Sequence, residues 1–232
     1  MAANCDWRSF PSREALAESL ADAVADALAG ALATRGRALL AVSGGSTPKR
    51  FFETLSRKPL AWANVIVTLV DERFVPPSSD RSNARLAREH LLVGEARHAR
   101  FIPLYNDAGS VEAAAARAQA ALALFGPSLD AAILGMGTDG HTASFFPDAE
   151  NLAMLLDPAN RTLVEPVHAP SAGEPRLTLP LARLVEARFL ALHIEGAEKR
   201  AVLEKALLPG SKLPVSAVVE HAPSPLRVYW AA

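Results

Sequence analysis

The sequence contains a single cysteine, Cys5, among its 232 residues. One cysteine cannot form an internal disulfide and has no second thiolate for a metal site, so we expect a reducing compartment. The sequence also lacks any run of about 18 apolar residues, and charges from Asp6 to Glu18 interrupt the segment where a signal peptide has its apolar core. These absences predict a cytoplasmic protein that does not enter a membrane.

An excess of charge of one sign is missing as well. The 24 Lys and Arg residues are balanced by 25 Asp and Glu residues, which leaves a formal net charge of −1. The basic residues are spread along the chain without interleaved aromatic residues, so we expect no nucleic-acid partner. The histidines show no metal-ligand spacing such as H-E-x-x-H, and no G-x-S-x-G motif occurs, so we expect no metal and no serine hydrolase of the α/β-hydrolase type.

Short apolar runs do occur, and they alternate with helical segments. Apolar runs without polar alternation are typical of buried strands in a mostly parallel sheet with helices on both faces. We predict strands over 37–43, 65–70, 129–134, 188–194 and 226–230, and helices over 14–35, 49–56, 82–92, 110–125 and about 197–207. The expected fold is a doubly wound α/β domain spanning residues 1–232, with a loose N-terminus and with loops and sheet edges in the proline-rich segments near 76, 166–180 and 223.

Polar stretches follow these strands, at the edge where doubly wound sheets bind ligands. The first is SGGSTP (43–48). Its two glycines allow the backbone to turn its amides outward, Thr47 can cap the following helix and Pro48 fits its first turn. Two glycines with two hydroxyls are more than a tight turn or a helix cap requires. We therefore predict a phosphate site formed by Gly44, Gly45, Ser46 and Thr47. The stretch lacks the Gly-Lys-Ser/Thr of a nucleotide P-loop, which favours a monophosphate.

The next polar stretch, DER (71–73), allows two interpretations. Such a triplet is often a surface ion pair. At the exit of a predicted strand, however, Arg73 could hold an anion in the crevice while Asp71 makes polar contacts there.

The third stretch, GMGTDGHTASFFP (135–147), spells G-x-G-x-x-G after a predicted strand. A dinucleotide site would need a helix beginning at Gly140 and an acidic residue about 20 residues later. Asp157 lies at a tolerable distance, but Pro147 interrupts any helix early. The alternative is a sharp glycine turn that presents His141 as a general base beside Asp139. We favour the second interpretation, because the first leaves the Asp-Gly-His core unexplained.

These stretches and the later G-x-x-K (196–199) occur in an order that closely resembles the lactonase branch of the glucosamine-6-phosphate isomerase/6-phosphogluconolactonase family. The resemblance covers most of the chain. It implies a Rossmann-like α/β fold and the hydrolysis of 6-phosphoglucono-1,5-lactone in the oxidative pentose phosphate pathway, without a cofactor. The partner would be this small phosphorylated sugar lactone, and we expect a monomer.

The resemblance also implies roles for individual residues. His141 would be the general base that activates water, with Asp71 and Asp139 as orienting or polar groups in the crevice. The phosphate would be held by Arg73, by Lys199 and by the loop at Gly44, Gly45, Ser46 and Thr47. The sequence does not identify the donors to the oxyanion or the acid that protonates the leaving ring oxygen.

Two other functions remain as alternatives. The deaminase branch of the family has a glutamate just before the proline of the third stretch, where this chain has Phe146. An apolar side chain cannot assist the proton transfers of sugar-ring opening, so Phe146 favours a lactonase. A non-catalytic sugar-phosphate-binding protein would keep the phosphate loop but would not need His141.

Overall fold

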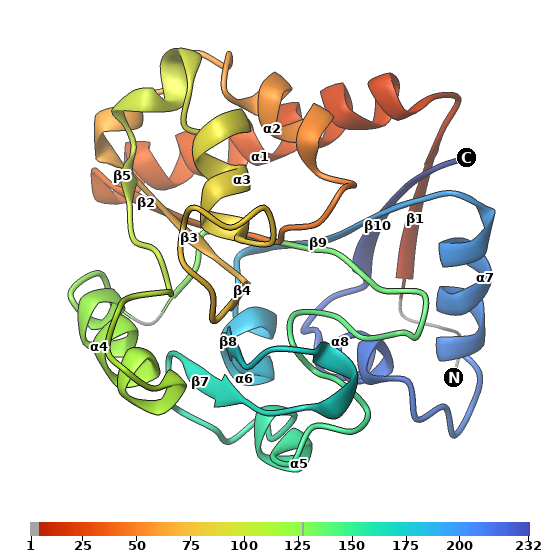
Figure 1. Ribbon diagram of the computed structural model, residues 1–232. Coiled ribbons are helices and arrows are strands. Elements are labelled where there is room, and N and C mark those ends of the chain that lie inside the picture. Colours follow the sequence, from red (N-terminus) through yellow and green to blue (C-terminus); the bar gives the residue numbers. More distant parts are fainter. Residues whose placement is uncertain (1–4, 127) are drawn as a thin grey trace.

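The structure, a computed structural model, describes residues 5–126 and 128–232, in which two sheets are surrounded by helices (Figure 1). The main sheet has seven strands in the order β1–β10–β9–β6–β2–β3–β5, and all of its neighbouring pairs are parallel. The strands are β1 (Cys5–Phe10), β10 (Leu226–Ala231), β9 (Phe189–Glu195), β6 (Ala131–Leu134), β2 (Ala38–Val42), β3 (Val65–Leu69) and β5 (Arg100–Phe101). This sheet confirms the predicted doubly wound α/β class.

The predicted helices are present on both faces of this sheet. They are α1 (Arg13–Arg35), α2 (Lys49–Leu55), α3 (Asn83–His90), α4 (Val111–Ala123) and α7 (Ala197–Ala206). The structure adds α5 (Leu152–Leu155), α6 (Leu181–Val185) and α8 (Pro214–His221), for which no prediction was made from the sequence. Figure 1 shows α1, α2 and α3 on one face, with α4, α6 and α8 on the other.

The long helix α1 illustrates how local sequence signals set the elements. Its N-terminus is capped by the Ser12 hydroxyl, which accepts a hydrogen bond from the Ala15 amide. Its C-terminus ends at Gly36, whose φ of +70° favours glycine. Its apolar side chains at four-residue spacing, Leu16, Leu20, Val24 and Leu28, are fully buried against the sheet. Both phenylalanine pairs, at 51–52 and 145–146, are buried in the core as well.

A second, antiparallel sheet, which was not predicted from the sequence, includes two strands from the proline-rich segment at 166–180. This small sheet has the order β4 (Asp71–Arg73), β8 (Arg176–Thr178) and β7 (Glu165–Val167). Strands of three residues are too short to show a period of two, and a proline such as Pro166 is typical of a loop or an edge strand rather than of a central strand. Pro166 is tolerated because β7 lies at the edge of the sheet.

The N-terminal segment also differs from the prediction, because β1 is an ordered edge strand beside β10 from Cys5 onward. The stretch CDWRSF alternates polar and apolar side chains and therefore lacks the continuous apolar character of a buried strand. Phe10 stacks on Tyr229 with 5.8 Å between ring centroids. Burial raises the pKa of the Cys5 thiol to about 11. Among the described helices, none is long and apolar enough to cross a membrane.

Candidate active site

The predicted functional stretches meet in one cavity of about 260 Å³ at the carboxyl edge of the main sheet. Eight of the nine residues proposed from the sequence line it, namely Gly44, Gly45, Ser46, Thr47, Asp71, Arg73, His141 and Lys199. The ninth, Asp139, is not part of the lining, but its carboxylate contacts the His141 ring. Residues separated by more than 150 positions in the chain are brought together because their strands are neighbours in one parallel sheet.

The loop after β2 has the properties of an anion cradle. No described residue accepts a hydrogen bond from the backbone amides of residues 44–47. Gly45 has a φ of +90°, and a side chain at Gly44 would collide with Asn83, whose Oδ1 would lie 1.9 Å from the added Cβ. Both glycines are therefore required by the backbone path, and the loop can donate several N–H groups to one ligand.

The capping expected for the following helix differs in detail. The N-cap position of α2 is Pro48, without a side-chain capping bond, so Thr47 is not the cap. The Thr47 hydroxyl instead accepts a hydrogen bond of 3.3 Å from Lys199 Nζ. Thr47 is thus part of the cavity wall rather than of the helix end.

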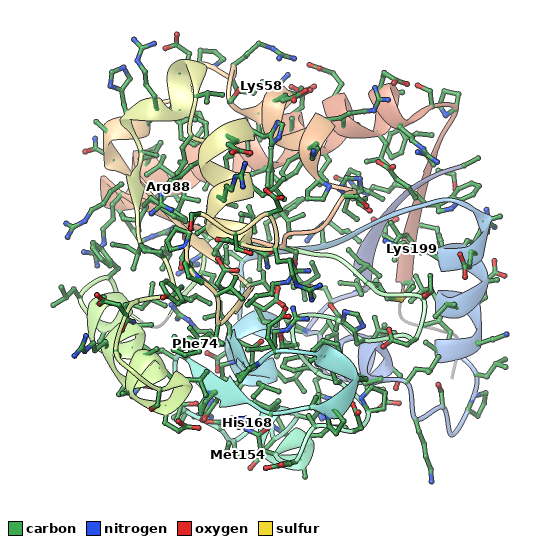
Figure 2. The ribbon with its side chains drawn as sticks, viewed as in Figure 1. Lys58, Phe74, Arg88, Met154, His168 and Lys199 are labelled. Carbon is green, nitrogen blue, oxygen red and sulfur yellow. The ribbon has the colours of Figure 1, made fainter. Side chains whose placement is uncertain are left out.

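Lys199 supplies a cation to the wall from the first turn of α7, and Figure 2 shows its place beside this helix. Its side chain is half-buried, and burial lowers the pKa of its ammonium group, whereas Glu195 and Glu198 oppose that decrease. A partly desolvated ammonium group interacts more strongly with an anion than one in bulk water does.

Strand β4 places Asp71 and Arg73 on one face and Glu72 on the other. The Asp71 carboxylate is buried and accepts a hydrogen bond of 2.7 Å from the Ser144 hydroxyl. Glu72 is fully buried and accepts bonds of 2.7 Å from the amides of Asn83 and Ala84, at the start of α3. The triplet is therefore not a surface ion pair, because two of its side chains line the cavity and the third ties the strand to a helix.

The Arg73 guanidinium is incompletely paired. Its Nη1 donates to the carbonyl oxygen of Arg81, while its buried Nε has no described partner. Buried donors are rarely left without an acceptor. The side chain is held in place and still has a hydrogen bond to offer.

The glycine-rich turn after β6 presents the histidine to the cavity. The Gly137 amide donates to the His141 carbonyl oxygen at 2.9 Å, and Gly140 has a φ of +79°. A side chain at Gly137 would lie 2.3 Å from His141 Cε1, so only glycine leaves room for the ring. No helix begins at Gly140, and the next one is α5. The dinucleotide interpretation of G-x-G-x-x-G is therefore wrong.

The two nitrogens of the His141 ring have different surroundings. Nδ1 lies 2.5 Å from Asp139 Oδ1, while Nε2 bonds to no residue in the described part of the chain. The carboxylate therefore fixes the tautomer with the proton on Nδ1 and leaves the lone pair of Nε2 available. The ring is supported by Phe146, whose centroid lies 4.5 Å away.

Two ionisable residues of the cavity lining were not predicted from the sequence, and both are nearly inaccessible to solvent. Arg176 lies on β8 and is 6% exposed. His193 lies on β9 and is 3% exposed, and its Nε2 lies 3.4 Å from Glu195 Oε1. A histidine inside an apolar strand could have been noticed from its place in FLALHIE. Arg176 gave no signal because its three-residue strand has no readable period.

The described residues contain no cluster of three or more His, Cys, Asp or Glu side chains that could hold a metal ion. The cavity therefore offers backbone amides, cations and one carboxylate-bound histidine. This set can bind a phosphorylated molecule and accept a proton from water next to it.

Comparison with known proteins agrees with these features. Residues 11–230 match the family model described as glucosamine-6-phosphate isomerases/6-phosphogluconolactonase. The chain is 57% identical over 229 residues to a 6-phosphogluconolactonase of Mesorhizobium japonicum, covering 99% of this chain and 96% of that protein. It is 46% identical over 200 residues to a 6-phosphogluconolactonase of Pseudomonas aeruginosa, covering 85% of this chain and 83% of that protein.

Solved structures show the same fold. A 6-phosphogluconolactonase from Shewanella baltica superposes with a TM-score of 0.95 at 38% identity, with complete coverage of both chains. A monomeric glucosamine-6-phosphate deaminase superposes with a TM-score of 0.77 at 18% identity, covering 97% of each chain. The fold alone thus does not distinguish a lactonase from a deaminase, so the distinction depends on the cavity residues.

Proposed function

Because the chain belongs to the glucosamine-6-phosphate isomerase/6-phosphogluconolactonase family, we propose that it hydrolyses 6-phospho-D-glucono-1,5-lactone to 6-phospho-D-gluconate. The observation that carries this proposal is the His141–Asp139 pair on the glycine turn, with Nδ1 bound and Nε2 available. The reaction has its place in the oxidative pentose phosphate pathway and needs no cofactor for its chemistry.

The proposed reaction begins with His141 Nε2 taking a proton from a water molecule as the water oxygen attacks the lactone carbonyl carbon. Asp139 stabilises the imidazolium that forms, because its carboxylate already accepts the Nδ1 proton. The tetrahedral intermediate collapses, the bond between C1 and the ring oxygen breaks, the ring oxygen takes up a proton, and the imidazolium releases the proton taken from water, which restores His141 as the base. The product is an open-chain acid with the phosphate at its other end.

The phosphate is held away from the reacting carbon, so its contribution is orientation rather than bond making. The proposed donors are the amides of residues 44–47, the Lys199 ammonium beside Thr47, and the Arg73 guanidinium. Sheet order supports this grouping, because β2 neighbours β3 and is separated from β9 only by β6. Asp71, held by Ser144, is proposed as a polar contact to the sugar ring.

The second candidate, a glucosamine-6-phosphate deaminase, receives less support from the cavity. Phe146 is 5% exposed and packs against the His141 ring, at the position where the deaminase branch has a carboxylate. A phenyl ring cannot carry a proton between sugar atoms.

One pair of assays tests the proposal. The purified protein is given fresh 6-phosphogluconolactone in one experiment and glucosamine 6-phosphate in another. We expect acceleration of lactone opening above its spontaneous rate and no release of ammonia. Ammonia formation without lactone acceleration would show that the chain is a deaminase, and binding of both compounds without turnover would favour a sugar-phosphate-binding protein.

A further inference from the structure

Two arginines face each other across the small antiparallel sheet. Arg73 on β4 and Arg176 on β8 are direct register partners. Side chains directly opposite each other in an antiparallel pair lie on the same face and close together, and like charges in that position repel. Both arginines line the cavity. A pair of this kind becomes favourable when an anion lies between the two guanidinium groups.

The direction of this face is fixed by its neighbours. Asp71 and Thr178 are the next register pair on the same face, and both contact Ser144. The Ser144 hydroxyl donates to Asp71 at 2.7 Å, and the Ser144 amide donates to Thr178 Oγ1 at 3.2 Å. Ser144 follows the turn that carries His141. The face bearing the two arginines is therefore directed into the cavity that His141 also lines.

The hydrogen bonds of Arg176 are also incomplete. Its Nη2 donates to the Ala172 carbonyl oxygen at 2.9 Å, whereas its buried Nε has no described partner. Arg73 Nε is in the same state. Two opposed guanidinium groups thus each have a buried donor without an acceptor, which is uncommon in folded proteins.

Nearby carboxylates do not satisfy these donors. Glu174 Oε1 lies 3.4 Å from Arg176 Nη2, but it accepts its hydrogen bonds from the exposed Arg81. Asp71 attracts Arg176 electrostatically, yet no hydrogen bond joins the two side chains in the described structure. Burial lowers the pKa of the Arg176 guanidinium, because removal from water destabilises its charged form.

We infer that Arg176 is a further substrate-binding residue, which clamps the phosphoryl group of the substrate together with Arg73. Guanidinium groups suit this task because their planar donors match pairs of phosphate oxygens. The inference rests on the proposed function for the identity of the substrate, but the anion site itself can be tested without turnover. Arg176 also lies over the Phe146 ring, 5.4 Å from its centroid, so a positioning effect on His141 is the competing explanation.

The first experiment measures the binding of inorganic phosphate by phosphorus NMR titration. Arg176→Gln should weaken the affinity roughly 10- to 100-fold, as expected for the loss of a charge-assisted contact. The matched control is Arg81→Gln, which removes an equal charge from the same region. Arg81 is bound to Glu174, lies outside the cavity and has a 58% exposed side chain, so its loss should change the affinity less than about twofold. Equal affinities in wild type and Arg176→Gln would overturn the inference.

Arg176→Lys keeps the charge and most of the side chain, and it becomes the deciding variant if Arg176→Gln does not fold. A lysine cannot reproduce the planar pair of donors, so phosphate affinity should still fall about threefold or more. Unchanged affinity in a folded Arg176→Lys protein would show that Arg176 does not contact the anion.

The second experiment separates phosphate binding from an effect on His141. The activity of Arg176→Gln is compared on 6-phosphogluconolactone and on glucono-1,5-lactone, which lacks the phosphate. We expect a higher KM for the phosphorylated lactone and little change in the weak activity on the plain one. An equal loss of kcat on both would assign Arg176 to positioning the histidine and overturn the clamp. Weakened phosphate binding in a protein without lactonase activity would support the clamp while contradicting the proposed function.

Discussion

The two ring nitrogens of His141 differ in their hydrogen bonding, because Nδ1 contacts a carboxylate and Nε2 has no partner among the described residues. Asp139 binds Nδ1 at 2.5 Å, and the ring lies so close to Gly137 that no side chain fits there. Glycine is thus needed for the space as well as for the turn. The pairing of a carboxylate with one nitrogen is what converts an ordinary partly exposed histidine into a candidate base.

The role of His141 is tested by replacing it with asparagine, which remains polar but cannot accept the proton. We expect kcat of His141→Asn on the phosphorylated lactone to fall roughly 100-fold or more. Phosphate affinity should be nearly unchanged, because the proposed anion donors are intact.

A matched control is available at His168, which is also paired with a carboxylate. Its Nε2 lies 2.8 Å from Glu112 Oε1, outside the cavity and near α5 in Figure 2. His168→Asn should therefore keep a kcat within about twofold of wild type, as expected for a surface change. A near-normal kcat in His141→Asn would show that the histidine is structural.

At the residue level, the sequence predicted best where a motif follows an apolar run. Ser46, Arg73 and His141 were found because the strands before them are continuous and the carboxyl ends of parallel strands meet. Arg176 and His193 were missed because neither comes directly after a continuous apolar run: Arg176 lies in a strand of three residues, and His193 lies within β9 itself. A strand residue enters a cavity only when a neighbouring element leaves space for it, which no local pattern encodes.

At the scale of elements, the site depends on how β4 is joined to α3. The fully buried Glu72 carboxylate accepts hydrogen bonds of 2.7 Å from the amides of Asn83, Ala84 and Arg73, and one of 3.1 Å from the Ser82 hydroxyl. Burial raises the pKa of Glu72, and the three backbone donors oppose that rise. One side chain thus satisfies the first turn of α3 and fixes the strand that carries Arg73.

Glu72→Gln tests this connection. The amide would place its NH₂ group against backbone donors that need an acceptor, so the free energy of unfolding should fall by about 2–4 kcal/mol. Phosphate affinity should fall as well, because Arg73 is held less firmly. Urea unfolding measures the first effect and phosphorus NMR the second.

The control for Glu72 is Glu89→Gln at the other end of α3. Glu89 is exposed and forms a 2.7 Å pair with Arg85 one turn earlier. Its replacement should change the free energy of unfolding by no more than about 0.5 kcal/mol. Equal stability of the two variants would mean that the Glu72 carboxylate does not hold β4 to α3.

At the scale of the whole molecule, strand order explains why one cavity collects the functional residues. On one side of β2 the sheet continues with β3 and β5. On the other side it continues with β6, β9, β10 and the N-terminal strand β1. The order reverses between β2 and β6, and the loops after these two strands carry the anion cradle and the histidine. Ligand sites at such reversals are a general property of doubly wound sheets.

The reversal could not be predicted from the sequence alone. Apolar runs identify strands but not their neighbours, and the edge strands β1 and β5 have little apolar character to reveal them. The second sheet depends on pairing between residues about 100 positions apart, such as Glu72 and Leu177. The order of the loops around the cavity therefore could not be predicted from the sequence, whereas the class of fold could.

We propose that the chain is one domain that unfolds cooperatively, and its three tryptophans can test this. Trp7 and Trp230 lie at the β1–β10 edge of the main sheet, with the Arg200 guanidinium 5.3 Å and 4.5 Å from their rings. Trp62, which is 2% exposed, lies in the short 3-10 helix η1 (Trp62–Asn64) before β3, near the opposite edge. Fluorescence from either group therefore reports on one end of the sheet.

The experiment uses two proteins, Trp62→Phe and the double variant Trp7→Phe/Trp230→Phe. In each, urea unfolding is followed by fluorescence and by far-ultraviolet circular dichroism. Since both measurements come from the same variant, any destabilisation by the substitutions shifts them together. A single cooperative domain requires the two midpoints to coincide in both proteins. If fluorescence at one edge changed at a lower urea concentration than the circular dichroism, that edge would unfold separately, and residues 1–232 would contain more than one cooperative unit.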